Sequence, residues 1–228
     1  YYIIEYFDFY DNRPENFSKY VNDNISNKII DQLIDFKTTK LKGVKYSKNR
    51  PIFNVYRIIT KLLINRYRKF FLVKLIFLIT LLYFKNLKLF FIKVATKGDF
   101  TERNILIKED VVKFIDFDSY YDKGSWLQDA TYLLLHQDVE IENLKWQKKF
   151  FVKYLQNVHL NFMRLNKDYI RFWLLLTSLQ QFSIRYFQKQ KNLVNIDSVL
   201  HKEQHIKYFL NKEKFNLFIN KIGYNDQL

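Results

Sequence analysis

Glycine and proline are scarce in this chain, which has only four glycines and two prolines among 228 residues. Tight turns draw heavily on these two residue types, so their scarcity argues against a sandwich of many short strands and favours long helices. Hydrophobic residues make up 48% of the chain, including 23 Phe and 17 Tyr. A chain of this length and composition can bury a core of its own, and we therefore expect a folded, mainly helical protein.

The chain is strongly basic, with a formal net charge of +15 that comes mostly from lysine. An AT-rich coding sequence produces abundant Lys, Asn, Ile, Phe and Tyr by itself, so the charge alone is weak ground for a binding function. Basic patches could still attract phosphates. A non-catalytic basic helical module that binds nucleic acid or a membrane surface is therefore the alternative function. Salt-dependent binding without Mg²⁺–ATP binding would favour this alternative.

Several other classes of site are excluded or disfavoured by composition. The chain has no cysteine, which removes disulfide scaffolds, thiolate zinc sites and cysteine nucleophiles. His201 and His205 are spaced to share a helix face, but their neighbours offer no clear third metal ligand, and we expect a surface helix there. No signal segment is visible at the start, so we expect a cytoplasmic protein.

The apolar run Phe70–Phe84 could suggest a membrane span. It contains Lys74 and is shorter than the roughly 20 apolar residues that a span needs. We expect a buried core helix and no transmembrane segment, with a membrane segment and a surface-lying amphipathic helix as the alternatives.

Apolar periodicity predicts the elements along the chain. Short strands are expected at residues 1–10, 87–96, 104–107 and 111–117, the last two forming a hairpin across "KED". A basic loop is expected at residues 39–52. Helices are expected at residues 23–36, from Val55 to Phe84, and near Asp129–His136, Glu140–Leu165, Asp168–Lys191 and Leu200–Ile222.

Acidic and amide side chains gather in the stretch "TKGDFTERNILIKEDVVKFIDFDSYYD", residues 96–122. Asp99 follows a predicted strand, Asn104 enters the next one, and Asp116 ends the strand after that. These positions can bring three oxygen-bearing side chains to one end of a small sheet. Such oxygens suit Mg²⁺, and a carboxylate beside the metal can take a proton from a hydroxyl. Phosphoryl transfer requires this combination.

The segments "KGDFTERNILI", "VKFIDFD" and "WLQDA" together resemble the catalytic segment of the aminoglycoside phosphotransferase and choline kinase-like family, whose members have a protein-kinase-like fold. The resemblance implies that Asp99 is the catalytic base and that Asn104 and Asp116 are the Mg²⁺ ligands. It also implies that Asp129, at a helix start, braces the catalytic loop by accepting its backbone N–H groups. Lys97 departs from the family, which has a histidine there to hold this loop against the metal-binding strand.

The resemblance extends less specifically over the rest of the chain. Residues 1–10 resemble the hinge strand between the two lobes of such kinases, where Glu5 and Phe7 would contact adenine through their backbone. Residues 11–228 would form the C-terminal lobe, with a catalytic segment at 96–131 and a helical acceptor subdomain at about 140–228. The sequence shows no Gly-rich loop and no strand lysine paired with a helix glutamate. We therefore expect either a fragment of a longer product or a truncated, impaired relative.

The predicted fold class is α+β and mainly helical: a protein-kinase-like C-terminal lobe with a small β hairpin sheet at the cleft and an N-terminal lobe that is largely missing. The predicted function is a small-molecule phosphotransferase, or kinase, that uses Mg²⁺ and moves the γ-phosphoryl group of ATP, or GTP, to an acceptor hydroxyl. Its partners would be the nucleotide and a hydroxyl-bearing small molecule or glycan, with no specific nucleic acid. The sequence leaves the acceptor and the oligomeric state open, and the acceptor contacts suggested by the resemblance are Glu140, Glu142, Trp146 and Trp173.

Two other interpretations of the acidic stretch stay open. Its aspartates could simply cap helices and turns in a helix-rich domain. Alternatively, "FIDFD" could be the strand and Asp-x-Asp motif of a haloacid-dehalogenase-type phosphatase. That fold would need more parallel strands after residue 120, where the pattern is helical.

Overall fold

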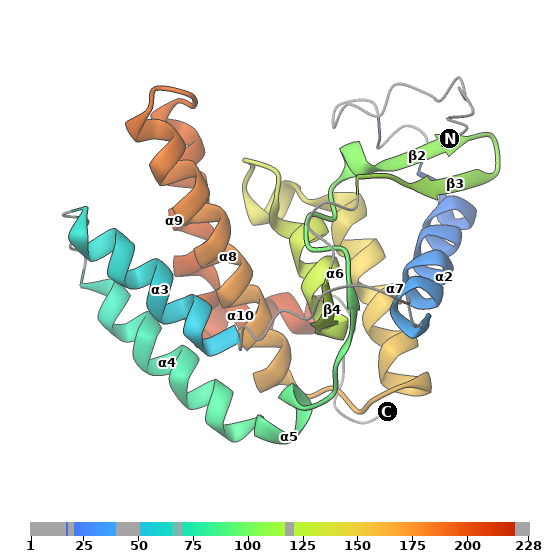
Figure 1. The fold of residues 1–228 in the computed structure, drawn as a ribbon, viewed down its shortest axis with the longest axis horizontal. Helices are drawn as coiled ribbons and strands as arrows, with labels where there is room; N and C mark the ends of the chain where they lie inside the picture. Colours follow the sequence, from blue (N-terminus) through green and yellow to red (C-terminus); the bar gives the residue numbers. More distant parts are fainter. Residues whose placement is uncertain are drawn as a thin grey trace.

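The computed structural model describes residues 17, 21–39, 51–65, 67, 70–116 and 121–221, without the side chains of 121–123. The predicted hinge strand at residues 1–10, with Glu5 and Phe7, lies outside the described residues. Within the described part the fold is α+β and mainly helical, as predicted from the scarcity of glycine and proline (Figure 1).

The helices and strands follow one another in a simple order. The α-helices are α2 (Asp23–Thr38), α3 (Pro51–Ile64), α4 (Phe71–Lys85), α5 (Leu87–Phe90), α6 (Trp126–Leu135), α7 (Lys145–Asn161), α8 (Lys167–Gln190), α9 (Ile196–Leu210) and α10 (Lys212–Lys221). The strands are β1 (Val94–Thr96), β2 (Ile105–Lys108), β3 (Val111–Phe114) and β4 (Tyr121–Gly124), with short 3₁₀ turns at Glu102–Asn104 and Ile141–Asn143.

Helix α2 lies beside the β2–β3 hairpin and α7 (Figure 1). It begins where the Asn22 side chain accepts a hydrogen bond from the N–H of Ile25, which satisfies one of the free donors of the first turn. Its buried residues recur at helical spacing and end with Lys37, whose side chain is fully enclosed. The predicted helix at residues 23–36 is therefore confirmed and is two residues longer.

The prediction of one helix from Val55 to Phe84 was wrong. The structure has two helices there, α3 and α4, which lie side by side as a hairpin (Figure 1). The chain turns near Tyr67, whose hydroxyl donates to Glu203 Oε2 at 2.6 Å and whose ring packs at a tilt against Phe182. This tertiary anchor on α8 and α9 overrides the local helical pattern.

The strands form two antiparallel pairs, β1 with β4 and β2 with β3. The predicted hairpin across "KED" is confirmed, with Ile105 opposite Phe114 and Lys108 opposite Val111, although its second strand ends earlier than predicted. The predicted strand at 87–96 was mostly wrong, because α5 occupies its first half and only Val94–Thr96 is extended. Gly124 lies against Thr96, where a Cβ would clash with the threonine side chain, so the β1–β4 pairing requires glycine here.

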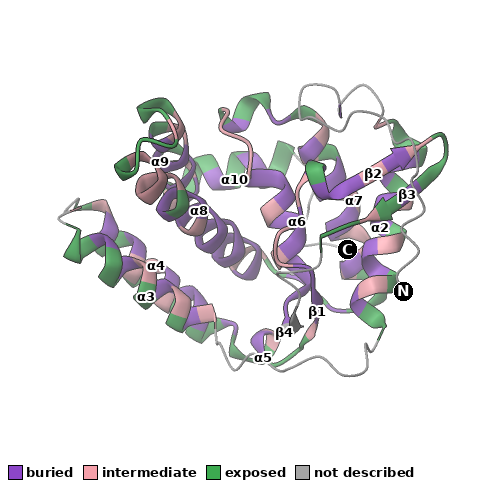
Figure 2. Ribbon diagram, turned by 45° about the horizontal axis from the view of Figure 1, so that its top comes forward, coloured by how far each residue is buried: buried purple, intermediate pink, exposed green. Residues whose placement is uncertain are grey.

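Helix α8 is the centre of the C-terminal part and packs against α3, α4, α6 and α9. Most of its residues between Tyr169 and Ser183 are buried, as the purple ribbon in Figure 2 shows. The predicted helix Leu200–Ile222 is two helices, α9 and α10, because the chain leaves the helical conformation at Asn211. Asn211 accepts from the N–H of Lys214 and so starts α10.

Two smaller sequence expectations can be compared with the described residues. No helix among them is both long enough and apolar enough to cross a membrane. The prediction that His205 lies on a surface helix was wrong, since His205 is buried and its Nε2 lies 2.6 Å from the carbonyl oxygen of Val139. Burial lowers the pKa of His205 to about 3.

Candidate functional site

Asp129, in the first turn of α6, accepts hydrogen bonds from the backbone of the loop between β1 and β2. Its Oδ2 accepts from the N–H of Lys97 at 3.2 Å, and its Oδ1 accepts from the N–H of Gly98 at 2.9 Å. Gly98 has a φ of 85°, a left-handed conformation that glycine adopts without a steric penalty and that turns both N–H groups toward the carboxylate. The brace that the resemblance implied for Asp129 is thus confirmed.

Asp129 is also paired with a buried lysine that the sequence did not reveal. Lys37, at the end of α2, places its Nζ 2.6 Å from Asp129 Oδ2, and both side chains have no exposed surface. The same ammonium lies 3.3 Å from the carbonyl oxygens of Ala95 and Ser125. Burial lowers the pKa of Lys37, and the neighbouring carboxylate opposes this effect. The pair ties α2, β1 and α6 together beneath the loop.

Lys97, which departs from the family pattern, is fully buried inside the loop. Its Nζ donates to the carbonyl oxygen of Asp99 at 3.2 Å and to the carbonyl oxygen of Asp116. One ammonium therefore links the loop that carries Asp99 to the end of the strand segment that carries Asp116. Lys97 thereby braces the loop against the strand segment by reaching two carbonyl groups.

Asn104 and Asp116 are brought together by the β2–β3 hairpin. The N–H of Ile115 donates to the carbonyl oxygen of Asn104 at 3.1 Å, which fixes the entry to β2 against the exit from β3. The Asn104 amide donates through Nδ2 to the carbonyl oxygen of Asp99 at 2.9 Å, so its Oδ1 is left as an acceptor. Asp116 has a φ of 57°, a left-handed conformation that aspartate tolerates better than most residues.

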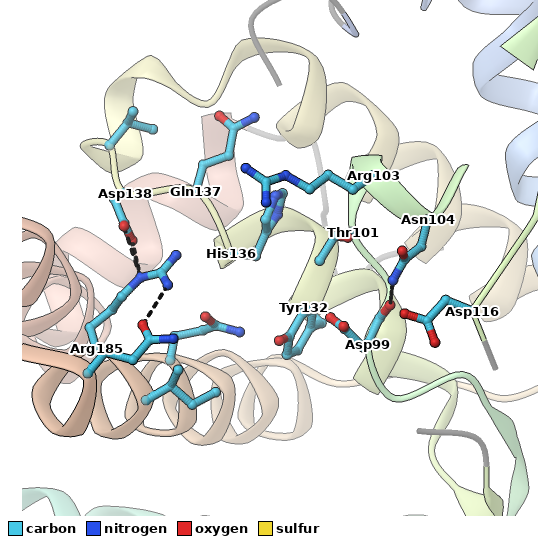
Figure 3. Close-up of a pocket in the computed structure, with 14 residues that line it drawn as sticks. Asp99, Thr101, Arg103, Asn104, Asp116, Tyr132, His136, Gln137, Asp138 and Arg185 are labelled. Atoms are coloured by element: carbon cyan, nitrogen blue, oxygen red, sulfur yellow. Dashed lines mark hydrogen bonds and ion pairs between the residues drawn. The ribbon is translucent and has the colours of Figure 1, made fainter. Parts of the chain in front are cut away.

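These side chains line one cleft of about 830 Å³, in which Asp99, Asn104 and Asp116 lie next to one another (Figure 3). The loop, the end of α6 and one face of α8 supply the walls. The lining residues are Asp99, Thr101, Arg103, Asn104, Asp116, Tyr132, His136, Gln137, Asp138, Val139, Gln181, Ile184, Arg185 and Gln188. The structure therefore brings together the three residues predicted from spacing, which lie seventeen positions apart in sequence at most.

Tyr132, one turn after Asp129 on α6, lies beside Asp99 in the cleft (Figure 3). Burial, followed by the negative charge of Asp99, raises the pKa of Tyr132 to about 12. The phenol therefore keeps its proton at neutral pH and can act as a donor. Sequence analysis missed this residue, although its spacing from Asp129 would have placed it on the same side of the helix.

The far wall of the cleft is a charged network. Arg185 of α8 lies 2.9 Å from Asp138 Oδ2 and donates to Gln188 Oε1 at 2.9 Å. Asp138 also lies 3.2 Å from Nζ of the buried Lys202, whose pKa is lowered by burial to about 8. These contacts hold the segment after α6 against α8 and α9 and fix the width of the cleft.

The loop itself contains a buried carboxylate, that of Glu102. Its Oε1 accepts from Nε2 of Gln137 at 2.9 Å, and its Oε2 contacts Nε2 of His136. The side chain thus anchors the loop to the end of α6. It was not singled out by sequence, because a charged residue in a loop is usually exposed.

The acceptor residues suggested by the resemblance lie elsewhere. Glu140, Glu142, Trp146 and Trp173 are absent from the lining of the cleft. Trp173 is buried between Phe90 and Tyr169 in the core, and Trp146 packs on Phe17. The polar side chains of Gln181, Arg185 and Asp138 line the cleft instead.

A metal at this site would depend on few protein ligands. Among the described residues, no three His, Asp or Glu side chains are grouped so that they could share an ion. The amide oxygen of Asn104 and the carboxylate of Asp116 nevertheless form a hard oxygen pair of the kind that Mg²⁺ accepts, since Mg²⁺ keeps several waters and takes other ligands from phosphates. The residues present therefore fit Mg²⁺ better than a metal that needs a complete protein cage.

Comparisons with known proteins leave the family undecided. No family model matches the chain, and a search of curated proteins found no similar sequence.

Proposed function

We propose that this chain is a kinase-like small-molecule phosphotransferase that moves the γ-phosphoryl group of ATP or GTP to an acceptor hydroxyl. The observation that carries the proposal is the meeting of Asp99, Asn104 and Asp116 at one cleft. The Asp129 contacts to the loop backbone add support. In this proposal the described residues correspond to the C-terminal lobe of a protein-kinase-like fold.

Each of the three cleft residues then has one role. The acceptor oxygen attacks the γ-phosphorus, the bond from that phosphorus to the bridging oxygen breaks, and the hydroxyl proton passes to the carboxylate of Asp99. Tyr132, which keeps its own proton, orients that carboxylate. Mg²⁺ held by Asn104 and Asp116 would neutralise the charge on the transferred phosphoryl group.

The brace by Lys97 supports an active loop despite the departure from the family histidine. Because its Nζ reaches the carbonyl oxygens of both Asp99 and Asp116, the two segments are held in register. A positioned base requires this kind of support, since small displacements of a reacting group lower rates strongly.

The cleft wall suggests the chemistry of the acceptor. Gln181, Gln188, Arg185 and Asp138 present amides and charges, with Val139 and Ile184 as the apolar contribution. Groups of this kind orient a ligand through several hydrogen bonds. We therefore propose a polar acceptor with more than one hydroxyl or amino group, such as a sugar, an amino alcohol or a glycan.

The experiment is ATP-dependent phosphorylation of a panel of sugars, amino alcohols and aminoglycosides by the 228-residue chain at millimolar Mg²⁺–ATP. Asp99→Asn keeps the shape of the base but removes its function, so transfer is expected to fall roughly 10²–10⁴-fold. Asp168→Asn, at an exposed position on α8, is the matched control and should leave transfer unchanged. Transfer that survives Asp99→Asn undiminished would refute the proposal.

A further inference from the structure

The outer side of the α3–α4 hairpin carries large apolar side chains that are open to solvent. On α4 and at its start, Phe70 is 75% exposed, Val73 62%, Phe77 72% and Phe84 61%, and on α3 Phe53 is 60% exposed. Soluble proteins seldom leave this many large apolar groups exposed on neighbouring turns unless the surface meets a partner. We call this surface the hairpin face. Its residues are Phe53, Tyr56, Leu63, Ile64, Phe70, Val73, Phe77, Leu81 and Phe84.

The exposed side chains of the two helices form one continuous surface. The hydroxyls of Tyr56 on α3 and Thr80 on α4 are 3.0 Å apart, so these two positions face each other across the hairpin. Because the helices run antiparallel, the start of α3, which carries Phe53, lies toward the end of α4, which carries Phe84 (Figures 1 and 2). The other end of the hairpin then carries Leu63, Ile64 and Val73.

Helix α4 is apolar on two opposite sides, and only one of them is covered. Its buried residues pack toward α8, and they are Leu72, Leu75, Ile79, Leu82 and Tyr83. The exposed stripe at Val73, Phe77 and Phe84 follows the same helical spacing on the other side. Packing against α8 therefore explains why the buried side of α4 is apolar. Packing among the described residues does not explain why the exposed side is apolar as well.

The two helices of the hairpin carry charge of a single sign, and the nearby Asp168 of α8 is paired with Lys85 at the end of α4. Between Pro51 and Gly98 the sequence has no Asp or Glu and ten Lys or Arg residues. Arg57, Lys61 and Lys74 are exposed on the two helices themselves. A second copy of the chain placed on this face would bring like charges together, which disfavours a homodimer here. The occupant must therefore offer both negative charge and apolar surface.

We infer that the hairpin face docks on the surface of an anionic lipid bilayer. Basic side chains beside exposed Phe, Leu and Val are the combination that binds such interfaces, with the apolar groups inserted below the headgroups and the cations among them. A nucleic acid would meet the cations, but burial of Val73, Leu81 and Ile64 would gain little from its phosphates. This inference does not depend on the proposed phosphotransferase activity.

The test is flotation of the 228-residue chain with phosphatidylcholine vesicles, with and without phosphatidylserine. Binding is expected only with phosphatidylserine and should weaken as salt is raised. The double variant Val73→Ser with Phe77→Ser should lower the partition coefficient at least about tenfold, because both side chains would leave the acyl boundary. The matched control, Leu160→Ser with Leu217→Ser, replaces exposed apolar residues on α7 and α10 and should bind as the parent does.

Two double charge-reversal variants test the role of the basic side chains. Lys61→Glu with Lys74→Glu should lower binding at least about tenfold. Lys191→Glu with Lys212→Glu makes the same change of net charge at exposed positions outside the hairpin face and should have a smaller effect. No binding of the parent chain to phosphatidylserine vesicles would overturn the inference, and so would equal losses from the hairpin and control variants. Binding to an oligonucleotide but not to vesicles would assign the face to nucleic acid instead.

Discussion

Removing the carboxylate of Asp129 should destabilise the fold strongly, because this carboxylate serves two loop N–H groups and a buried ammonium. Asp129→Ala strands the N–H groups of Lys97 and Gly98, and each unsatisfied buried donor costs about 1–3 kcal/mol. It also leaves the Lys37 ammonium without its counter-charge, and removing one partner of a buried pair costs about 3–5 kcal/mol. Lys37 retains two carbonyl partners and its pKa is already lowered, so the terms overlap. We expect a total loss of about 3–5 kcal/mol.

The assay is urea unfolding followed by circular dichroism, with the midpoint shift read at constant slope. Because domains of this size are stable by only about 5–15 kcal/mol, the single variant should unfold at low urea. Adding Lys37→Met to Asp129→Ala removes the stranded ammonium and should recover at least about 1 kcal/mol. Asp168→Ala, which breaks the exposed pair with Lys85, should change stability by about 1 kcal/mol or less. A double variant less stable than Asp129→Ala alone would refute the reasoning.

Three further predictions concern single residues. His205 has a pKa of about 3 in the fold against about 6.5 when unfolded, so the unfolded state binds more protons between these values and stability should fall as the pH drops from 6.5 toward 3. The urea midpoint should lose at least part of this pH dependence in His205→Gln, and an unchanged dependence would contradict the buried, neutral state. Lys97→Met removes the brace between loop and strand and should lower phosphoryl transfer at least about tenfold. Lys97→His should retain transfer. Equal transfer by the two variants would show that the brace is dispensable. Gly98→Ala places a residue with a side chain in the left-handed region and should lower the free energy of unfolding by about 1–2 kcal/mol. Urea unfolding measures this loss, and an unchanged urea midpoint would argue against the φ of 85°.

Local sequence patterns predicted those elements whose stability is decided locally. The β2–β3 hairpin follows from two short apolar strands around "KED", and its register sets Asn104 near Asp116. Helices α2 and α8 were likewise predicted from apolar periodicity, and in the structure they begin at the capping residues Asn22 and Asn166. Because the three cleft residues lie on this one segment, spacing was sufficient to predict that they meet.

Contacts between distant parts of the chain could not be predicted in this way. Lys37 and Asp129 are 92 positions apart. No local sequence pattern predicts that Lys37 is buried beneath the loop. The break between α3 and α4 depends on Tyr67 reaching Glu203, which lies 136 positions later. The wall formed by Arg185 and Asp138 likewise exists only because α8 packs against the segment after α6.

In the proposed mechanism, Asn104 and Asp116 hold a divalent cation beside Asp99. The most direct measurement is a Mn²⁺ titration followed by electron paramagnetic resonance, which needs neither the acceptor nor the nucleotide. The parent chain should bind Mn²⁺, and Asp116→Asn should weaken that binding at least about tenfold, because loss of a ligand exceeds the usual effect of an outer-shell change. Asp99→Asn should bind Mn²⁺ as the parent does, since the base is not a ligand. Equal binding by the parent and Asp116→Asn, or loss of binding only in Asp99→Asn, would contradict the account.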